Sequence, residues 1–118
     1  MMDRAVIIIN EPPSSMRAWN GFRLAAALVG AEMKPEVFLI NDGVFCAMRG
    51  QSTPEELAGQ NTSSKIAELQ GIGGVIRLCT QCANTRGLTE EAVVDGIEWV
   101  SMVDLAKSIK DAAKVVSF

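Results

Sequence analysis

The chain has 118 residues, which suffice for one domain but not for two that could each bury a core. Its net charge of −3 argues against a protein that binds the phosphate backbone of nucleic acids. The absence of histidine excludes Ser-His-Asp and Cys-His catalysis, and the odd count of 3 cysteines favours free thiols over a disulfide scaffold.

The N-terminal half alternates strand and helix patterns. The first strand is predicted at 4–10, where Val6–Ile9 is an apolar run of the kind that a parallel strand buried on both faces carries. A helix is expected at 16–31, where apolar residues recur at three- and four-residue spacing. The second strand is predicted at 36–41. Two Pro residues and an Asn-Asp-Gly sequence end the two strands.

The middle of the chain is less regular. The apolar segment 44–48 is too short for a full helix, so we expect a helical turn that packs against the sheet edge or another subunit. The polar stretch 50–64 predicts a mobile loop. It runs into a helix predicted at 62–70, and a third strand is predicted at 74–79.

The C-terminal third continues the alternation. A helical turn is predicted over 80–88, followed by a short strand at 97–100. Ser101 is the expected N-cap of a helix at 102–110, and a last strand is predicted at 114–118.

This order of elements predicts the fold class. Five short apolar strands that alternate with helices indicate an α/β fold with a mostly parallel sheet, in a single domain over residues 1–118. Right-handed crossovers would place helices on both faces of the sheet. The N-terminal apolar run, 5–9, is far shorter than the roughly 18 residues of a membrane span, so we expect a soluble cytoplasmic protein without a membrane partner.

The carboxyl ends of the predicted strands gather the polar and thiol groups of the chain. Parallel strands end at one edge of a sheet, and sites form there. The residues expected at this edge are Asn10, Glu11, Asn41, Asp42 and the three cysteines, Cys46, Cys79 and Cys82. Glu11 and Asp42 fit turn residues as well as site carboxylates, and Cys46 lies between apolar neighbours that favour a packing role.

Cys79 is the best placed of the thiols. It stands where a strand gives way to a helical turn, and backbone N–H groups at such a turn stabilise a thiolate. Arg86 follows seven residues later and, if the segment is helical, shares its face and could approach the sulfur. Both effects predict a lowered pKa for the Cys79 thiol, which would make it a nucleophile without histidine. A small core residue is the alternative.

Cys79 and Cys82 form a Cys-x-x-Cys pair. Such a pair supports disulfide exchange, metal binding or the handling of persulfides. A zinc site is disfavoured because the chain has no histidine and no second Cys-x-x-Cys, so we expect neither a metal nor an organic cofactor.

The segment that contains this pair resembles the signature of a known family. The sequence is similar to the DsrE/DsrF-like sulfur-relay family, and within it to the YchN-like branch, which has Cys-x-x-Cys-x-x-x-Arg-Gly at this place. The similarity covers essentially the whole chain. The matching segments are 41–44, 48–51, 78–88, 95–98, 102–106 and 114–118.

The resemblance implies a fold, an assembly and an activity. It implies a three-layer α/β/α sandwich that forms homotrimers or homohexamers. It also implies that Cys79 carries sulfur as a persulfide in exchange with donor and acceptor proteins, with Cys82 in an accessory role and Arg86 stabilising the anion. Two alternatives stay open, an oligomeric binding module without catalysis and a dithiol redox protein that uses the Cys79–Cys82 pair.

Overall fold

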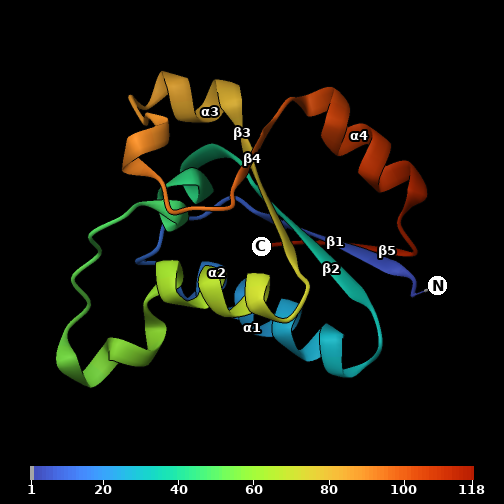
Figure 1. Ribbon diagram of the computed structural model, residues 1–118, viewed down its shortest axis with the longest axis horizontal. Helices are drawn as coiled ribbons and strands as arrows, with labels where there is room; N and C mark the ends of the chain where they lie inside the picture. The colour runs from blue at the N-terminus through green and yellow to red at the C-terminus, as the bar shows by residue number, and fades with distance from the viewer. Residues whose placement is uncertain (1) are drawn as a thin grey trace.

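The computed structural model describes residues 2–118 and contains one five-stranded sheet in the order β4-β3-β2-β1-β5 (Figure 1). All neighbouring strands in it are parallel, which confirms the predicted fold class and makes the sheet entirely parallel. The strands are β1 (Arg4–Ile9), β2 (Lys34–Leu39), β3 (Val75–Cys79), β4 (Glu98–Val100) and β5 (Lys114–Ser117).

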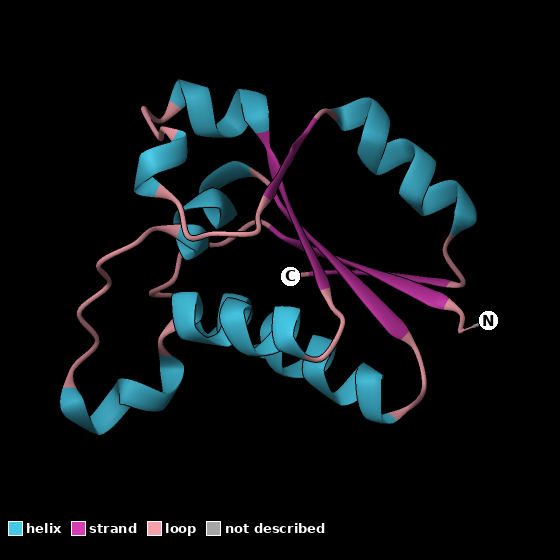
Figure 2. Ribbon diagram, in the orientation of Figure 1, coloured by secondary structure: helices cyan, strands magenta, loops and turns pink. Residues whose placement is uncertain are grey.

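Within residues 2–118, four α-helices and three 3-10 helices connect the strands. Figure 2 shows how they are arranged around the sheet. The predicted helices are present, and residues 44–47 of the apolar segment belong to a 3-10 helix that begins earlier, at Asn41, and has Met48 as its C-cap. The helices are α1 (Met16–Gly30), η1 (Asn41–Ala47), η2 (Glu55–Gln60), α2 (Thr62–Gly71), α3 (Thr80–Thr85), η3 (Glu90–Ala92) and α4 (Met102–Asp111).

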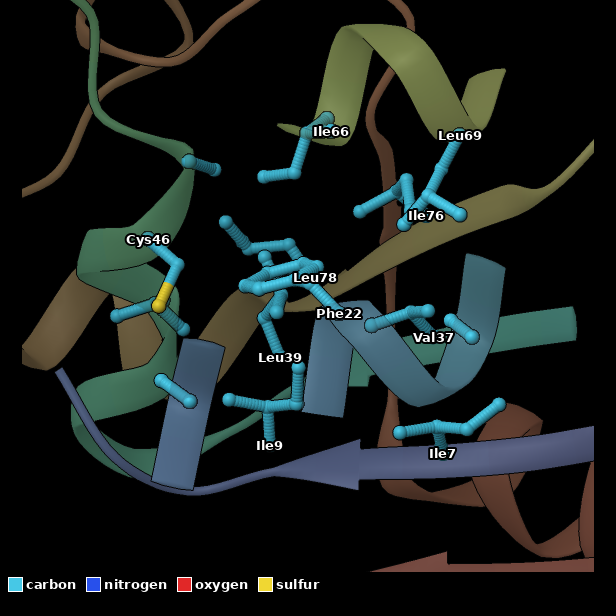
Figure 3. Packing of buried hydrophobic residues seen from close by; sticks show 14 of the residues in the cluster. Ile7, Ile9, Phe22, Val37, Leu39, Cys46, Ile66, Leu69, Ile76 and Leu78 are labelled. Carbon is cyan, nitrogen blue, oxygen red and sulfur yellow. The ribbon is translucent and has the colours of Figure 1, made fainter. Parts of the chain in front are cut away.

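Most of the core lies on the face of the sheet that α1 and α2 cover. Alternate residues of β1, β2 and β3 point to this side, because successive side chains of a strand point to opposite faces. Phe22 of α1 and Ile66 of α2 pack onto them, and Figure 3 shows Cys46 of η1 in the same cluster. These residues are withdrawn from water, which is the main stabilising contribution to the fold.

The opposite face is covered by α4 and has a much smaller apolar cluster. Its buried members are Val6, Phe38 and Leu105. A buried carboxylate lies on this face too: Glu36 of β2 is only 2% exposed and pairs with Arg77 of β3 and, at 3.6 Å, with Arg4 of β1. The two helical layers on either side of the sheet thus bury it to very different extents.

A close backbone contact positions the carboxyl edge of the sheet. Gly43 of η1 lies so near β1 that a Cβ atom at this position would be 2.0 Å from the carbonyl oxygen of Ile9. Only glycine allows this approach. η1 is therefore held directly over the ends of β1 and β2, where the candidate residues gather.

No helix within residues 2–118 combines the length and the apolar character that a membrane span requires.

Candidate functional site

All three cysteines lie at the carboxyl edge of the sheet, as the order of the elements predicts. Cys79 is the last residue of β3, Cys82 lies in the first turn of α3, and Cys46 lies in η1. All three are free thiols. Their surroundings differ: Cys79 and Cys82 form a pair in contact, whereas Cys46 packs in the core.

Cys79 and Cys82 are in contact at the start of α3. The backbone N–H of Cys82 donates a hydrogen bond to Sγ of Cys79, 3.4 Å away, so Cys79 serves as the N-cap of the helix. Cys79 is 7% exposed, whereas Cys82 is half-buried. Cys82 is therefore the more exposed thiol of the pair.

The pKa of the Cys79 thiol is raised, not lowered as the sequence predicts. Burial is the largest cause, and hydrogen bonding to the Cys82 side chain adds to it. Backbone N–H groups of Cys82 and Gln81 lower the pKa, but burial outweighs them. Cys79 consequently keeps its proton more firmly than a free cysteine does.

Cys79 faces a narrow apolar crevice on the α4 side of the sheet. The crevice lies between the ends of the strands and the start of α4, and it is too narrow to hold a water molecule. Cys82 instead packs against the large cluster on the α1 and α2 side. Besides Cys79, the crevice is lined by Phe38, Ile40, Val100, Ser101, Met102 and Leu105.

Arg86 does not contact the Cys79 sulfur, contrary to the prediction. α3 ends at Thr85, and Arg86 caps it instead of continuing it for another turn. The guanidinium donates from Nε to Oδ1 of Asp42 at 2.9 Å and from Nη1 to the carbonyl oxygen of Cys82 at 3.2 Å. Arg86 and Asp42 thus join α3 to η1, and their contact with the thiol pair is through the backbone of Cys82.

Asn41, which the sequence predicts at this edge as the end of a strand but not as a site residue, contacts the pair directly. Its backbone N–H donates to Sγ of Cys82 at 3.2 Å. Asn41 has a φ of 51°, in the left-handed region that few residues other than glycine adopt. Asn is one of those few. An Asn at the end of a strand, before Asp-Gly, is the signal from which this turn could have been foreseen.

Asn10 holds Asn41 in place. Its Oδ1 accepts a hydrogen bond from Nδ2 of Asn41 at 2.9 Å. Its own Nδ2 donates to the carbonyl oxygen of Phe118 at 3.0 Å and to Oγ of Ser117 at 3.2 Å. A chain of polar contacts therefore runs along the edge of the sheet from β5 through β1 to the thiol of Cys82.

Cys46 and Glu11 lie apart from this chain of contacts. Cys46 is fully buried, and its S–H donates to the carbonyl oxygen of Glu11 at 3.4 Å. Burial raises the pKa of the Cys46 thiol to about 12, outweighing a hydrogen bond with Thr62. The Glu11 carboxylate pairs with Arg17, 3.8 Å away. In this arrangement Cys46 is a core residue and Glu11 a turn residue.

Comparison with known proteins places this geometry among relatives. The model of the DsrE/DsrF-like family matches residues 3–118. The chain is 32% identical to the protein YchN of Escherichia coli over 120 aligned positions, with 99% of this chain and 100% of the relative covered. It is 33% identical to an uncharacterised protein of Methanopyrus kandleri, covering 99% of this chain and 95% of the relative.

Solved structures give the same picture. The crystal structure of the Escherichia coli ychN protein superposes with a TM-score of 0.88 at 30% identity, over 100% of both chains. A protein of unknown function from Methanobacterium thermoautotrophicum superposes with a TM-score of 0.77 at 19% identity, covering 97% of this chain and 98% of the other. The second likeness concerns the fold alone.

Proposed function

The chain belongs to the DsrE/DsrF-like family, and on this premise we propose that it is a small sulfur carrier, which holds a persulfide on Cys79 and passes the outer sulfur to an acceptor thiol. Membership of a family of sulfur-relay proteins makes sulfur the expected cargo. One observation carries the assignment to this residue: Cys79 is a free thiol at the floor of an apolar crevice, in contact with a second thiol.

This environment suits storage of a reactive sulfur atom. Apolar neighbours limit hydrolysis and oxidation of a persulfide, and the N–H of Cys82 points at the sulfur that would carry it. The acceptor thiolate would attack the outer sulfur from the side of Cys82, because the crevice admits no molecule of that size, and Cys79 would leave as the thiolate. No metal or organic cofactor takes part in this exchange. The free thiols suit the reducing cytoplasm.

Sulfur loading measured by mass spectrometry tests this function. The protein is incubated with glutathione persulfide, the donor is removed, and the sulfur is located by peptide mass. We expect wild type and Cys46→Ser to retain one additional sulfur atom on the peptide that contains Cys79 and Cys82, and Cys79→Ser to lose any sulfur that it takes up once the donor has been removed. Cys46→Ser is the matched control because that thiol lies in the core. Equal retention by Cys79→Ser would remove the assignment.

Contact between the two thiols supports a second candidate, a dithiol redox protein. Cys79 caps α3 and Cys82 follows three positions later, which is the placement of a redox-active Cys-x-x-Cys pair. The reduction potential of the pair separates the candidates. A potential near the cytosolic glutathione poise, together with no sulfur retention, would favour dithiol chemistry.

We also propose that the partner of the chain is a second copy of itself, in a homotrimer or homohexamer. Nine large apolar side chains of the described residues are exposed, and five of them lie in α4 and β5. An apolar surface of this kind is unusual for a monomer and typical of an interface. These five are Met102, Val103, Ile109, Val115 and Val116.

A further inference from the structure

The two thiols of the pair differ in access. Cys79 is 7% exposed and faces a crevice that cannot admit a water molecule, so a donor persulfide cannot reach its sulfur from that side. Cys82 is half-buried and lies one helical turn further on, at the surface of the carboxyl edge. A donor persulfide therefore reaches the sulfur of Cys82 more easily than the sulfur of Cys79.

The hydrogen bonds at the two sulfurs also differ. The N–H of Asn41 donates to Sγ of Cys82 at 3.2 Å, while Cys79 accepts the N–H of Cys82 at the longer distance of 3.4 Å. A backbone N–H that donates to a sulfur favours the thiolate over the thiol. At Cys79, burial and the neighbouring Cys82 side chain raise the pKa of the thiol.

The backbone of Asn41 is bent to make this contact. Asn41 has a left-handed φ of 51°, a conformation that is uncommon in residues other than glycine and that recurs at functional sites. The side-chain hydrogen bond from Asn41 to Asn10 holds the conformation from outside the thiol pair. Turn formation alone does not require that the N–H be aimed at a sulfur.

We infer that Cys82, and not Cys79, is the thiol that takes sulfur from the donor, and that the N–H of Asn41 positions its sulfur and stabilises the thiolate for this step. The inference rests on the proposed function, because it adds the entry step to storage on Cys79. Asn41 acts here as a positioning residue, since its contact is with the nucleophile.

The transfer takes place in two balanced steps. The Cys82 thiolate attacks the outer sulfur of a donor R–S–SH. The donor S–S bond breaks, R–S⁻ leaves with the electron pair, and Cys82 becomes Cys82–S–SH. The Cys79 sulfur then attacks the same outer sulfur, and Cys82 leaves and takes the proton of the Cys79 thiol. The products are Cys79–S–SH and Cys82–SH, and neither step needs an added oxidant or reductant.

Alkylation by iodoacetamide tests the order of the thiols without any sulfur donor. Site-resolved peptide mass spectrometry gives the rate at each cysteine between pH 6 and 9. We expect Cys82 to react about tenfold faster than Cys79 at neutral pH, because the rate follows exposure and thiolate fraction. Faster alkylation of Cys79 than of Cys82 would overturn the inference.

Two substitutions at position 41 test the role of its N–H. Asn41→Gly keeps the N–H and adopts a positive φ without strain, whereas the β-branched side chain of Asn41→Val disfavours this φ and turns the N–H away. We expect Asn41→Val to slow alkylation of Cys82 several-fold and to shift its pH profile upward, with Asn41→Gly closer to wild type. A pH profile of Cys82 that is the same in both variants would contradict the positioning role.

The initial rate of sulfur loading decides between entry at Cys82 and entry at Cys79, whether or not Asn41→Val folds. With glutathione persulfide as donor and rapid trapping, Cys79→Ser is expected to form a persulfide on Cys82 at close to the wild-type rate. Cys82→Ser is expected to load Cys79 about tenfold more slowly. Loading of Cys82→Ser at the wild-type rate would contradict the inference and would be consistent with the proposed function. Absence of sulfur uptake by wild type would contradict both.

Discussion

At the scale of single residues, the three thiols of one edge have become chemically different through their neighbours. Cys46 is enclosed by the core, Cys79 by an apolar crevice, and Cys82 only in part. Sequence position could foresee the common edge, because the ends of parallel strands coincide. Which thiol is most buried could not be predicted from sequence position, because the burial of Cys79 depends on side chains from α4 and β2 that contact it only in the folded chain.

The prediction that Arg86 approaches the Cys79 sulfur was wrong for a similar reason. Seven residues of continuous helix would have put its side chain above Cys79, but α3 ends at Thr85 and Gly87 follows with a φ of 75°. The guanidinium then meets Asp42, which comes from a different element. A contact between elements of this kind cannot be derived from helical spacing alone.

The buried thiol of Cys46 makes the protein sensitive to alkaline pH. The pKa is about 12 in the folded state and near 9 in the unfolded chain. Above pH 9 the unfolded state therefore binds fewer protons, and the stability present below pH 9 is lost as the pH rises toward 12. We expect the stability advantage of wild type over Cys46→Ala to fall by about 1 kcal/mol per pH unit above pH 9.

Urea unfolding of the two proteins at pH 8, 9 and 10 measures this difference. Other ionising groups change both curves alike, so the difference between the curves isolates Cys46. Parallel curves over this range would show that the Cys46 thiol ionises in the folded protein as readily as in the unfolded chain.

At the scale of elements, the strands and helices were predictable because each has a local cause. The run Val6–Ile9 forms β1, and Ser101 starts α4 with the Asp104 carboxylate returning to its backbone N–H at 2.9 Å. The buried charge of Glu36 was not predictable from its own segment. Its partners, Arg77 and Arg4, come from the two neighbouring strands and meet it only when the sheet has formed.

The capping box of α4 gives a prediction about one element. Backbone and side-chain hydrogen bonds from Ser101 lower the pKa of Asp104, so this stabilisation is present above the ordinary carboxyl pKa and is lost as the pH falls through the lowered value. We expect Ser101→Ala to reduce the free energy of unfolding by about 1 kcal/mol near neutral pH. The loss should be smaller at pH 2.

The matched control is Ser64→Ala in α2, an exposed helical serine. There the substitution should be neutral or slightly stabilising, because alanine has the higher helix propensity. Urea unfolding measures both variants. Equal effects of the two substitutions would indicate that Ser101 contributes no more than its helix propensity.

At the scale of the whole molecule, the unequal cover of the two faces is the dominant feature. Helices α1 and α2 cover one face and α4 covers the other (Figure 1). The described residues form a large buried cluster on the first face and a cluster of three buried apolar residues on the second. The alternation of elements predicted helices on both faces. The alternation could not predict how little apolar surface α4 would bury on its face, since that depends on where the crossovers place each helix.

Exposed apolar residues on this sparse side lead to the expectation of self-association. Wild type should sediment as a trimer or hexamer, and Val103→Lys, at a position 62% exposed in α4, should shift the distribution toward smaller species. Ile72→Lys is the control, because Ile72 is 52% exposed but lies at the end of α2. Sedimentation velocity measures all three. A monomeric wild type would contradict the proposed assembly.

The two thiols of the pair are in contact at the edge of the sheet but have different neighbours. Cys82 packs with the α1 and α2 layer, and Cys79 faces the α4 layer. With entry at Cys82 and storage on Cys79, the closed crevice leaves one route to both sulfurs, from the side of Cys82. Donor and acceptor would then compete for one docking surface, and an excess of acceptor would slow loading. Such a carrier would release the donor before it binds the acceptor.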